Sequence, residues 1–308
     1  MSSTNLNDQI KTVLITGGTG LVGTQLSELL TSKGYTVTHL SRNPTQKGYQ
    51  TFYWNVKKME IDDEAITSAD AIIHLAGAGV SDKRWSAEWK KEIYDSRIDS
   101  TRLLKEKVAE LNPKLKHFTS ASAIGYYGWD SGDKLVDEES EKGDGFLADV
   151  VEDWEKEVDT FKELDIKISK VRIGIVLSER GGALVELMKP IKFGLGAPLA
   201  PGDQHMSWIH IQDLCGIFAH TLENSVEGIF NGVAPSPHTN KEFTKSVANQ
   251  LNKSLWLPNV PKFALRLIVG EMADILVGGN RVSSRKIEEA GFNFQFVSLN
   301  SALQDLLE

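Results

Sequence analysis

The chain has 308 residues, a formal net charge of −8 and a single cysteine, Cys215. The acidic balance argues against broad electrostatic attraction to nucleic acid or to an anionic membrane, and one cysteine excludes an internal disulfide framework. No stretch of about 18 uncharged apolar residues is present, so the sequence predicts no transmembrane helix. Met1–Gln9 is polar and lacks the apolar core of a signal peptide, so we expect a frayed tail and, by default, a cytoplasmic protein.

Strand and helix patterns alternate through the first 180 residues, which predicts a parallel sheet with crossover helices. Apolar stretches predict six strands: Thr12–Thr16, Thr36–Ser41, Thr51–Asn55, Ala71–Ala76, His117–Ser122 and Ile168–Leu177. Helical periodicity predicts helices between them at Leu21–Ser32, Ser86–Leu111 and Phe146–Leu164.

The stretch from Thr16 to Gly23 reads Thr-Gly-Gly-Thr-Gly-Leu-Val-Gly and joins the first strand to the first helix. In this setting Gly17 allows a tight turn, Gly20 lets the backbone approach a pyrophosphate, and Gly23 lets the helix pack closely. The phosphates would lie against free backbone N–H groups where the helix begins, at Leu21 and Val22. The motif therefore predicts a dinucleotide site.

Beyond residue 180, helices are predicted at Ala183–Phe193, Ile211–Leu222, Thr239–Leu251 and Pro261–Leu276, with one strand at Ile229–Val233. The predicted fold class is α/β: a Rossmann doubly wound parallel sheet of six or seven strands with a smaller C-terminal substrate lobe. We assign residues 1–178 and 206–234 to the Rossmann unit, and residues 179–205 and 235–308 to the lobe.

The end of the second strand distinguishes NAD from NADP. NAD-binding proteins place a carboxylate there to hold the ribose 2′-hydroxyl, whereas this strand ends in Ser41 and Arg42 without one. A guanidinium can pair bidentately with a 2′-phosphate, and Ser41 can donate a second hydrogen bond. The charge pattern favours NADP over NAD, with an ordinary surface arginine as the alternative.

The chain resembles the extended short-chain dehydrogenase/reductase superfamily, in its NAD(P)-dependent epimerase/dehydratase family and, within that, the YfcH-like epimerase subgroup. Besides the glycine motif, the resemblance depends on matches that run in order along the chain: Leu75-Ala76-Gly77, Arg84-Trp85, Ser96-Arg97-Ile98, the stretch 122–128, Trp154-Glu155, and the stretches 208–214, 231–235, 270–273 and 290–292.

This resemblance implies roles for several residues in binding the cofactor. Ser41 and Arg42 would hold the adenosine phosphate. Leu75, Ala76 and Gly77 would line the adenine–ribose side. Arg97 would reach the cofactor from the long helix, and Val176 would lie near the nicotinamide.

The usual catalytic pair of the superfamily is missing. Its Tyr and Lys stand four residues apart on one helix face, but the corresponding positions here hold Phe146 and Val150, which cannot transfer a proton. The single Tyr-x-x-x-Lys sequence, Tyr53 to Lys57, begins in a predicted strand. Residues four apart on a strand are about 13 Å apart, so we interpret this match as chance.

Other polar groups follow the fifth predicted strand. Ser122 either hydrogen-bonds a substrate oxygen or forms a turn, and Tyr126 or Tyr127 either donates a proton or packs in the loop. For His210 we favour a structural role between the lobes over acid/base work. We interpret His74 as a hydrogen-bonded core residue.

The sequence thus predicts an NADP-dependent oxidoreductase or epimerase-like enzyme that acts on an unknown small molecule, with a nucleotide-linked sugar as one candidate. The alternative is a catalytically degenerate NADP-binding sensor or scaffold. No residue spacing indicates a metal site, and no nucleic-acid or membrane partner is expected. The acidic run 137–141 and the pair Lys90-Lys91 are expected to be solvated.

Overall fold

The computed structural model describes residues 10–44 and 48–308, so the predicted frayed tail, Met1–Gln9, lies outside the described residues. In the described part of the chain, the main sheet has eight strands in the order β12-β8-β6-β5-β1-β2-β3-β4. These strands are β1 (Thr12–Thr16), β2 (Thr36–Ser41), β3 (Gln50–Asn55), β4 (Glu60–Ile61), β5 (Ala71–His74), β6 (His117–Ala123), β8 (Lys167–Ile173) and β12 (Gly228–Gly232). All neighbouring pairs are parallel except β3 and β4. The predicted Rossmann sheet is confirmed, but with eight strands instead of six or seven, because β4 adds a short antiparallel strand at one end.

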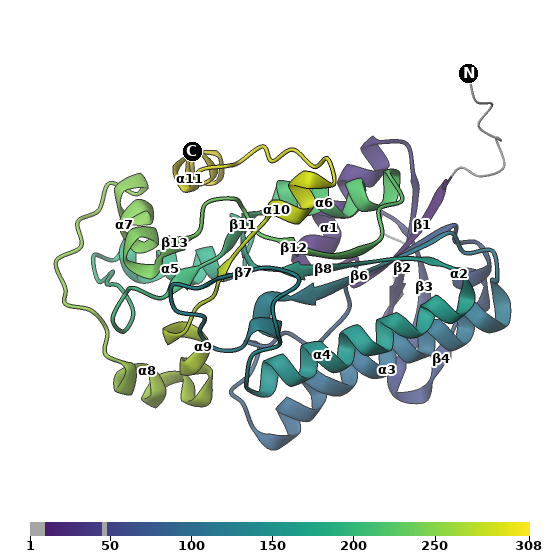
Figure 1. Ribbon diagram of the computed structural model, residues 1–308, viewed down its shortest axis with the longest axis horizontal. Helices are drawn as coiled ribbons and strands as arrows, with labels where there is room; N and C mark the ends of the chain where they lie inside the picture. Colours follow the sequence, from purple (N-terminus) through teal and green to yellow (C-terminus); the bar gives the residue numbers. More distant parts are fainter. Residues whose placement is uncertain (1–9, 45–47) are drawn as a thin grey trace.

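Helices cover both faces of this sheet, with α1 and α6 on one face and α3 and α4 on the other (Figure 1). The helices are α1 (Leu21–Ser32), α2 (Asp63–Thr67), α3 (Ala87–Leu111), α4 (Phe146–Asp159), α5 (Ala183–Lys192), α6 (Ile211–Glu223), α7 (Asn240–Gln250), α8 (Lys262–Val269), α9 (Ala273–Val277), α10 (Arg285–Glu289) and α11 (Leu299–Leu307). Short 3-10 helices are η1 (Val56–Lys58), η2 (Ile124–Tyr127), η3 (Thr160–Leu164) and η4 (Gly270–Met272). The remaining strands are β7 (Leu135–Val136), β9 (Ile175–Leu177), β10 (His205–Met206), β11 (Trp208–His210), β13 (His238–Thr239) and β14 (Arg281–Val282). No helix in the described ranges is long and apolar enough to cross a bilayer.

The prediction of one strand over Ile168–Leu177 is wrong. Strand β8 pairs with β6 and β12, but at Gly174 the chain leaves the main sheet and β9 pairs with β11 instead. The backbone N–H of Gly174 still reaches the Gly232 carbonyl, whereas that of Ile175 donates to the Ser207 carbonyl. The hydrogen-bond partner changes within one residue, a switch that the strand-like residues on both sides of Gly174 do not reveal.

The prediction of one helix over Pro261–Leu276 is also wrong. The chain forms α8, η4 and α9 in succession. A φ angle of +67° at Gly270 ends the first helix, because this backbone conformation cannot continue a right-handed helix. Pro261 precedes α8 in an extended conformation and is not its first helical residue.

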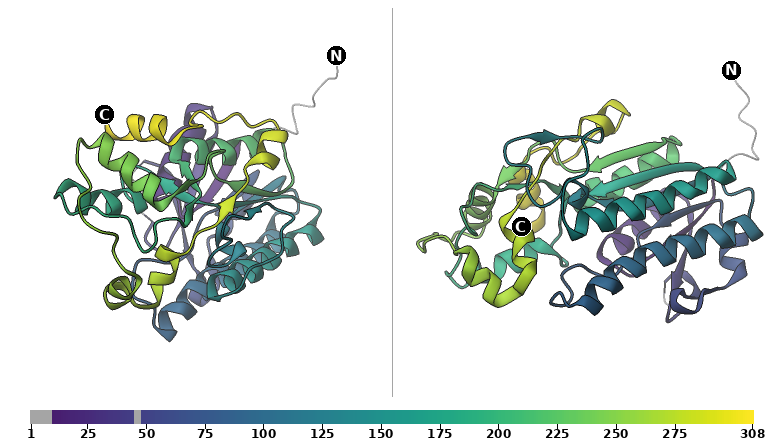
Figure 2. Two further views of the ribbon diagram at one scale, coloured as in Figure 1. Left: turned by 60° about the vertical axis from the view of Figure 1, so that its left-hand side comes forward. Right: turned by 60° about the horizontal axis from the view of Figure 1, so that its bottom comes forward.

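Among the described residues, two large hydrophobic cores lie next to each other, and a small third cluster gathers Tyr127, Val136, Val233 and Val282. The first fills the main sheet and its helices, and the second is formed by α5, α7 and α11 around Trp208 and Phe243 (Figures 1 and 2). After α10, Phe292 packs on the first core and Phe296 on the second. The chain therefore passes between the cores more than once, and the predicted division into two units stays a prediction.

Candidate functional site

The glycine turn lies where β1 ends and α1 begins. Gly17 has a φ angle of +69°, which favours glycine, and its carbonyl accepts the Gly20 N–H at 3.0 Å. A Cβ atom added at Gly23 would lie 2.2 Å from the Gly17 carbonyl oxygen. The turn and the first helical turn therefore touch through backbone atoms, and a larger residue at position 23 would separate them.

Helix α1 starts without a side-chain cap. Its N-cap is Gly20, which offers no hydrogen bond, and no acidic residue lies in its first turn. Side chains cap α3, α6, α7 and α11 through Ser86, His210, Thr239 and Ser298, whereas α1, like α4 and α5, begins after a glycine without such a cap. The first N–H groups of a helix need partners from outside it, so those at Leu21 and Val22 are suited to an anion such as a pyrophosphate.

The turn after β5 is tied to the glycine turn through Thr16. The Thr16 hydroxyl oxygen accepts the N–H groups of Leu75 and Ala76, both at 3.1 Å, and lies 2.7 Å from Nδ1 of His74. Burial, followed by the charge of Arg97, lowers the pKa of His74 to about 3. His74 is thus the hydrogen-bonded core residue predicted from the sequence.

Arg97 projects from α3 beside this second turn. Its Nη1 donates to the carbonyls of Ala78 at 3.1 Å and Ile93 at 2.8 Å. A Cβ added at Gly77 would lie 3.2 Å from the guanidinium carbon. Burial lowers the pKa of Arg97 to about 10, so the side chain stays cationic at neutral pH beside the predicted adenine–ribose residues.

Ser41 and Arg42 follow β2 at the same edge of the sheet. The Ser41 hydroxyl exchanges hydrogen bonds with the backbone of Asn43 at 3.2 Å. Arg42 is exposed, and in the described ranges it forms neither an ion pair nor a hydrogen bond. Its guanidinium is therefore available to a phosphate.

Val176 lies in β9, beyond the break, and pairs with Ile209. A Cβ added at Gly182 would lie 3.3 Å from the Leu21 side chain and 3.7 Å from the Val176 carbonyl oxygen. Val176 is therefore close to the start of α1, and with it the residues predicted to contact the cofactor surround one edge of the sheet.

Two of the three predicted catalytic residues, Ser122 and Tyr127, belong to one buried polar network. The Ser122 hydroxyl donates to Oε1 of Glu155 at 2.6 Å, and Arg172 donates to both oxygens of Glu155 at 2.8 Å. Arg172 also donates to the Tyr127 hydroxyl at 3.1 Å, which in turn donates to Oδ1 of Asn231 at 2.8 Å.

Electrostatics keep Arg172 charged and Tyr127 neutral near pH 7. Burial alone would lower the pKa of Arg172, but the bidentate bond to Glu155 outweighs it and raises that pKa above its usual value. Burial raises the pKa of Tyr127 to about 12. Because the Tyr127 hydroxyl is neutral and already engaged, it is poorly suited to be a base near neutral pH.

Tyr126 differs from its neighbour. The guanidinium carbon of Arg172 lies 3.5 Å from the centre of the Tyr126 ring, a cation–π contact that orients the ring. Tyr126 is only half-buried, and its hydroxyl forms no hydrogen bond with the described residues. Of the three predicted catalytic residues, Tyr126 is the one with a hydroxyl free to meet a substrate.

Glu155, Arg172 and Asn231 were not among the residues predicted for this site. A signal was present for Glu155, because it is a charge on a face of α4 that it shares with Val151 and Val158. Arg172 gave a weaker signal, because β8 also contains Lys167 and Lys170. A charge that interrupts a core face indicates a buried partner.

The structure also shows where two other sets of residues lie: Phe146 and Val150, which replace the usual Tyr and Lys, and the chance match Tyr53 to Lys57. Phe146 makes an edge contact with Trp85, with ring centres 5.3 Å apart, and Val150 is buried. Tyr53 bonds to Glu60 at 3.4 Å, and Lys57 pairs with Glu92 at 2.9 Å. The Tyr-x-x-x-Lys sequence therefore belongs to the surface beside β3 and η1.

His210 has the structural role favoured from the sequence. It caps α6 by accepting the Gln212 N–H at 3.2 Å, its ring stacks on Phe296 with centres 3.8 Å apart, and its Nε2 lies 3.2 Å from a carboxylate oxygen of Asp305. Burial lowers its pKa to about 4, against the opposing effect of Asp305. His210 thus connects α6 to the C-terminal segment.

The two expectations about solvated charges hold for most of these residues, but one charged residue in each set is partly buried and has a distant partner. Glu138, in the acidic run, accepts the backbone N–H of Asn231 at 2.6 Å, and burial raises its pKa. Lys90 pairs with Glu271 of η4, because α3 begins next to that segment. In neither case does the local sequence reveal the distant partner.

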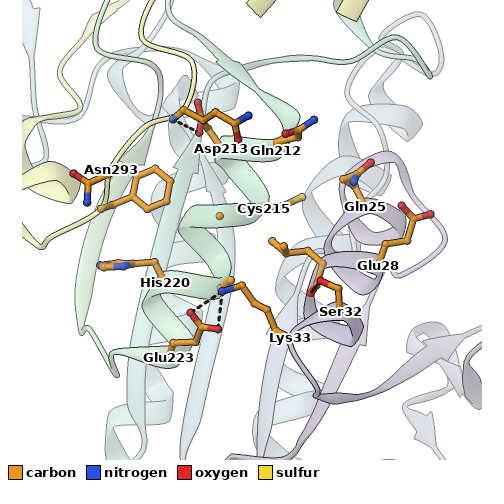
Figure 3. A pocket seen from close by; sticks show the side chains of 15 residues that line it. Gln25, Glu28, Ser32, Lys33, Gln212, Asp213, Cys215, His220, Glu223 and Asn293 are labelled. Carbon is orange, nitrogen blue, oxygen red and sulfur yellow. Dashed lines mark hydrogen bonds and ion pairs between the residues drawn. The ribbon is translucent and has the colours of Figure 1, made fainter. Parts of the chain in front are cut away.

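A separate groove of about 560 Å³ runs between α1 and α6 (Figure 3). Gln25 and Glu28 line one wall, Cys215 and His220 line the other, and Lys33 bridges to Glu223 at one end. None of the residues predicted for cofactor or substrate lines it. Burial raises the pKa of the Cys215 thiol to about 12, so it is not a reactive thiolate.

Comparisons with known sequences agree with this geometry. The NAD dependent epimerase/dehydratase family matches residues 13–145, and a domain of unknown function, DUF1731, matches residues 260–306. Epimerase family protein ML0860 of Mycobacterium leprae is 35% identical over 293 residues, which cover 94% of each chain. Epimerase family protein SDR39U1 of Homo sapiens is 33% identical over 300 residues, which cover 96% of this chain and 99% of the relative.

Solved structures extend the likeness to three dimensions. The crystal structure of human epimerase family protein SDR39U1 (isoform2) with NADPH has a TM-score of 0.85 and 33% identity, and the match covers 96% of this chain and 99% of that one. The Thermus thermophilus UDP-glucose 4-epimerase complex with NAD has a TM-score of 0.75 at 20% identity, which supports the fold alone. The chain therefore belongs to the NAD dependent epimerase/dehydratase family, within the extended short-chain dehydrogenase/reductase superfamily.

Proposed function

We propose that the protein is an NADP-dependent epimerase-like enzyme or oxidoreductase that acts on a small molecule, for which a nucleotide-linked sugar is one candidate. The observation that carries the proposal is the uncapped start of α1 together with the unpaired Arg42 at the end of β2 in the described chain. The human relative crystallised with NADPH supports the choice of cofactor. The single, buried cysteine supports a reducing compartment such as the cytoplasm as part of the proposal.

The cofactor's role is to donate or accept a hydride when bound. The residues of the chain then bind and orient the reacting oxygen. Tyr126, oriented by the guanidinium of Arg172, donates a hydrogen bond to that oxygen. The Ser122 hydroxyl donates its hydrogen bond to Glu155, so its oxygen lone pairs remain to accept a hydrogen bond from a substrate hydroxyl.

The cofactor assignment is tested by titrating NADPH and NADH against wild type and Arg42→Ala. Loss of a charge-assisted contact to the 2′-phosphate should weaken NADPH binding about tenfold, equivalent to about 1.4 kcal/mol, and leave NADH binding unchanged. Arg285→Ala, an exposed site on α10, is the matched control. Equal loss for both cofactors, or no binding of NADPH by folded wild type, would contradict the proposal.

A second candidate function is a cofactor-binding sensor or scaffold without catalysis. The engaged hydroxyls of Ser122 and Tyr127 favour it, as does the absence of a proton-transferring side chain at Phe146 and Val150. Turnover of NADPH with a carbonyl substrate panel that is lost in Tyr126→Phe would decide for the enzyme. A partner captured with NADPH but not with NADP⁺, without turnover, would decide for the sensor.

A further inference from the structure

Lys90 lies where the start of α3 meets η4. Its ammonium lies 5.4 Å from the centre of the Trp85 ring and 5.5 Å from that of Phe146, and it pairs with the carboxylate of Glu271. The Trp85 ring also contacts Trp129, with centres 6.2 Å apart. We call these five residues, Trp85, Lys90, Trp129, Phe146 and Glu271, the lobe junction.

The lobe junction adjoins the predicted catalytic residues. A Cβ added at Gly125 of η2 would lie 3.5 Å from the Leu147 side chain, one residue after Phe146. The backbone N–H of Gly143 also donates to the Tyr126 carbonyl at 2.9 Å. The segment that leads into α4 therefore runs beside η2, and Phe146 of the lobe junction begins the helix that follows this segment.

The Lys90–Glu271 pair is not a buried structural bond. The Lys90 side chain is 31% exposed and that of Glu271 is 64% exposed. Exposed ion pairs contribute little to stability, so either partner can be exchanged at low cost. By contrast, the Trp85 ring under Lys90 is held in place, because its indole N–H donates to the Val80 carbonyl at 2.9 Å.

Building on the proposed function, we propose that Lys90 binds a carboxylate of the small-molecule substrate, and that Glu271 occupies this place when substrate is absent. The lobe junction combines a cation with aromatic faces, which suits a carboxylate carried on a flat or apolar group. Substrate binding then replaces one carboxylate with another and releases η4 from α3.

The probe is benzoate, with benzamide as its neutral counterpart, titrated by ligand-observed NMR against protein with and without saturating NADPH. Glu271→Gln removes the competing carboxylate and should tighten benzoate binding up to about fivefold. Lys90→Gln should weaken it about tenfold. Lys91→Gln, whose wild-type ammonium pairs with Asp95, is the matched control and should behave as wild type.

Benzamide binding should be the same in all four proteins. Benzoate binding that is unchanged in Lys90→Gln or in Glu271→Gln would overturn the proposal, as would no benzoate binding to any of them. A larger gain for phenyl phosphate than for benzoate in Glu271→Gln would overturn the assignment of a carboxylate. Failure of NADPH to bind wild type would contradict the proposed function, whereas the benzoate series without NADPH tests Lys90 separately.

Discussion

Single charges in the interior define this site more than the exposed ones do. Arg172 and Glu155 have side chains that are 2% and 7% exposed, and they hold Ser122, Tyr126 and Tyr127 in one arrangement. A buried pair of this kind adds little net stability, but removal of one partner leaves the other charge without compensation. The arrangement of the candidate catalytic residues thus depends on both charges.

Glu155→Gln should lower the free energy of unfolding by about 3 kcal/mol, because a neutral amide leaves the Arg172 guanidinium uncompensated. Urea denaturation measures the loss. Glu157→Gln on the same helix breaks a partly exposed pair with Arg102 and should cost less than about 1 kcal/mol. Equal losses in the two variants would show that Glu155 is not the critical partner.

His74 makes stability depend on pH. Its pKa in the folded protein is about 3, below the ordinary value of about 6.5 for histidine. Below pH 6.5 the unfolded chain therefore binds a proton that the folded chain does not bind. Stability should fall as pH drops from 6.5 toward 3. Between pH 7 and pH 5, wild type should lose about 2 kcal/mol more than His74→Gln.

Urea titrations at several pH values test this difference. Between pH 7 and pH 8 the gap between the two proteins should stay constant, because the imidazole is then neutral in both states. Parallel losses between pH 7 and pH 5 would show that His74 does not carry the effect.

At the scale of elements, the alternation of patterns predicts most of the main sheet. β1, α1 and β2 have the predicted bounds, because each combines clear periodicity with a turn residue at its end. Helix α11 was missed, although Leu299, Leu303 and Leu306 share its buried face. The switch of partners at Gly174 could not be predicted, because both halves of that stretch contain β-branched residues typical of strands and only tertiary pairing separates them.

The candidate site, like the main sheet, could be predicted where its signals are local in the sequence. Glycines and strand ends are local signals, so the residues expected around the cofactor lie at one edge of the sheet. The Ser122–Glu155–Arg172 connection joins three elements far apart in sequence. Pattern alone indicates that Glu155 and Arg172 need partners, but not which ones.

Gly23→Ala tests the contact between the glycine turn and α1. The added Cβ would meet the Gly17 carbonyl oxygen, so α1 must shift away from the turn. The free N–H groups at the start of α1 would then no longer point toward the pyrophosphate. NADPH affinity should fall at least about tenfold. Fluorescence titration with NADPH measures it, with far-UV circular dichroism as a check on folding.

Gly181→Ala is the control for this substitution, since its Cβ would meet only the Leu21 side chain at an ordinary 3.9 Å. It should bind NADPH like wild type. Undiminished affinity in Gly23→Ala would mean that the turn tolerates the shift.

For the whole molecule, the path of the chain couples the two cores. Asp213, at the start of α6, accepts the N–H groups of Gln295 at 2.8 Å and Phe296 at 2.9 Å. Burial raises the pKa of Asp213, against the opposing effect of these two bonds. The carboxylate thus fixes the point at which the chain leaves the first core for the second.

Because of this coupling, calorimetry should show one cooperative unfolding transition rather than two. NADPH at a hundred times its Kd should add about 2.7 kcal/mol to the stability of that single transition. Two resolved transitions, with only one shifted by NADPH, would show that the cores unfold independently.

The bonds around Thr16 also determine where one hydrogen atom resides. The Thr16 oxygen already receives two amide protons, so its own proton must go to Nδ1 of His74. The imidazole therefore carries its hydrogen on Nε2, which donates a hydrogen bond to the Ser100 hydroxyl oxygen at 3.1 Å. The Ser100 hydroxyl in turn donates to the Ser96 carbonyl at 2.7 Å. This one-way relay sets a single tautomer, so the ring nitrogens of His74 are a built-in spectroscopic reporter of whether the two turns around the cofactor edge stay joined.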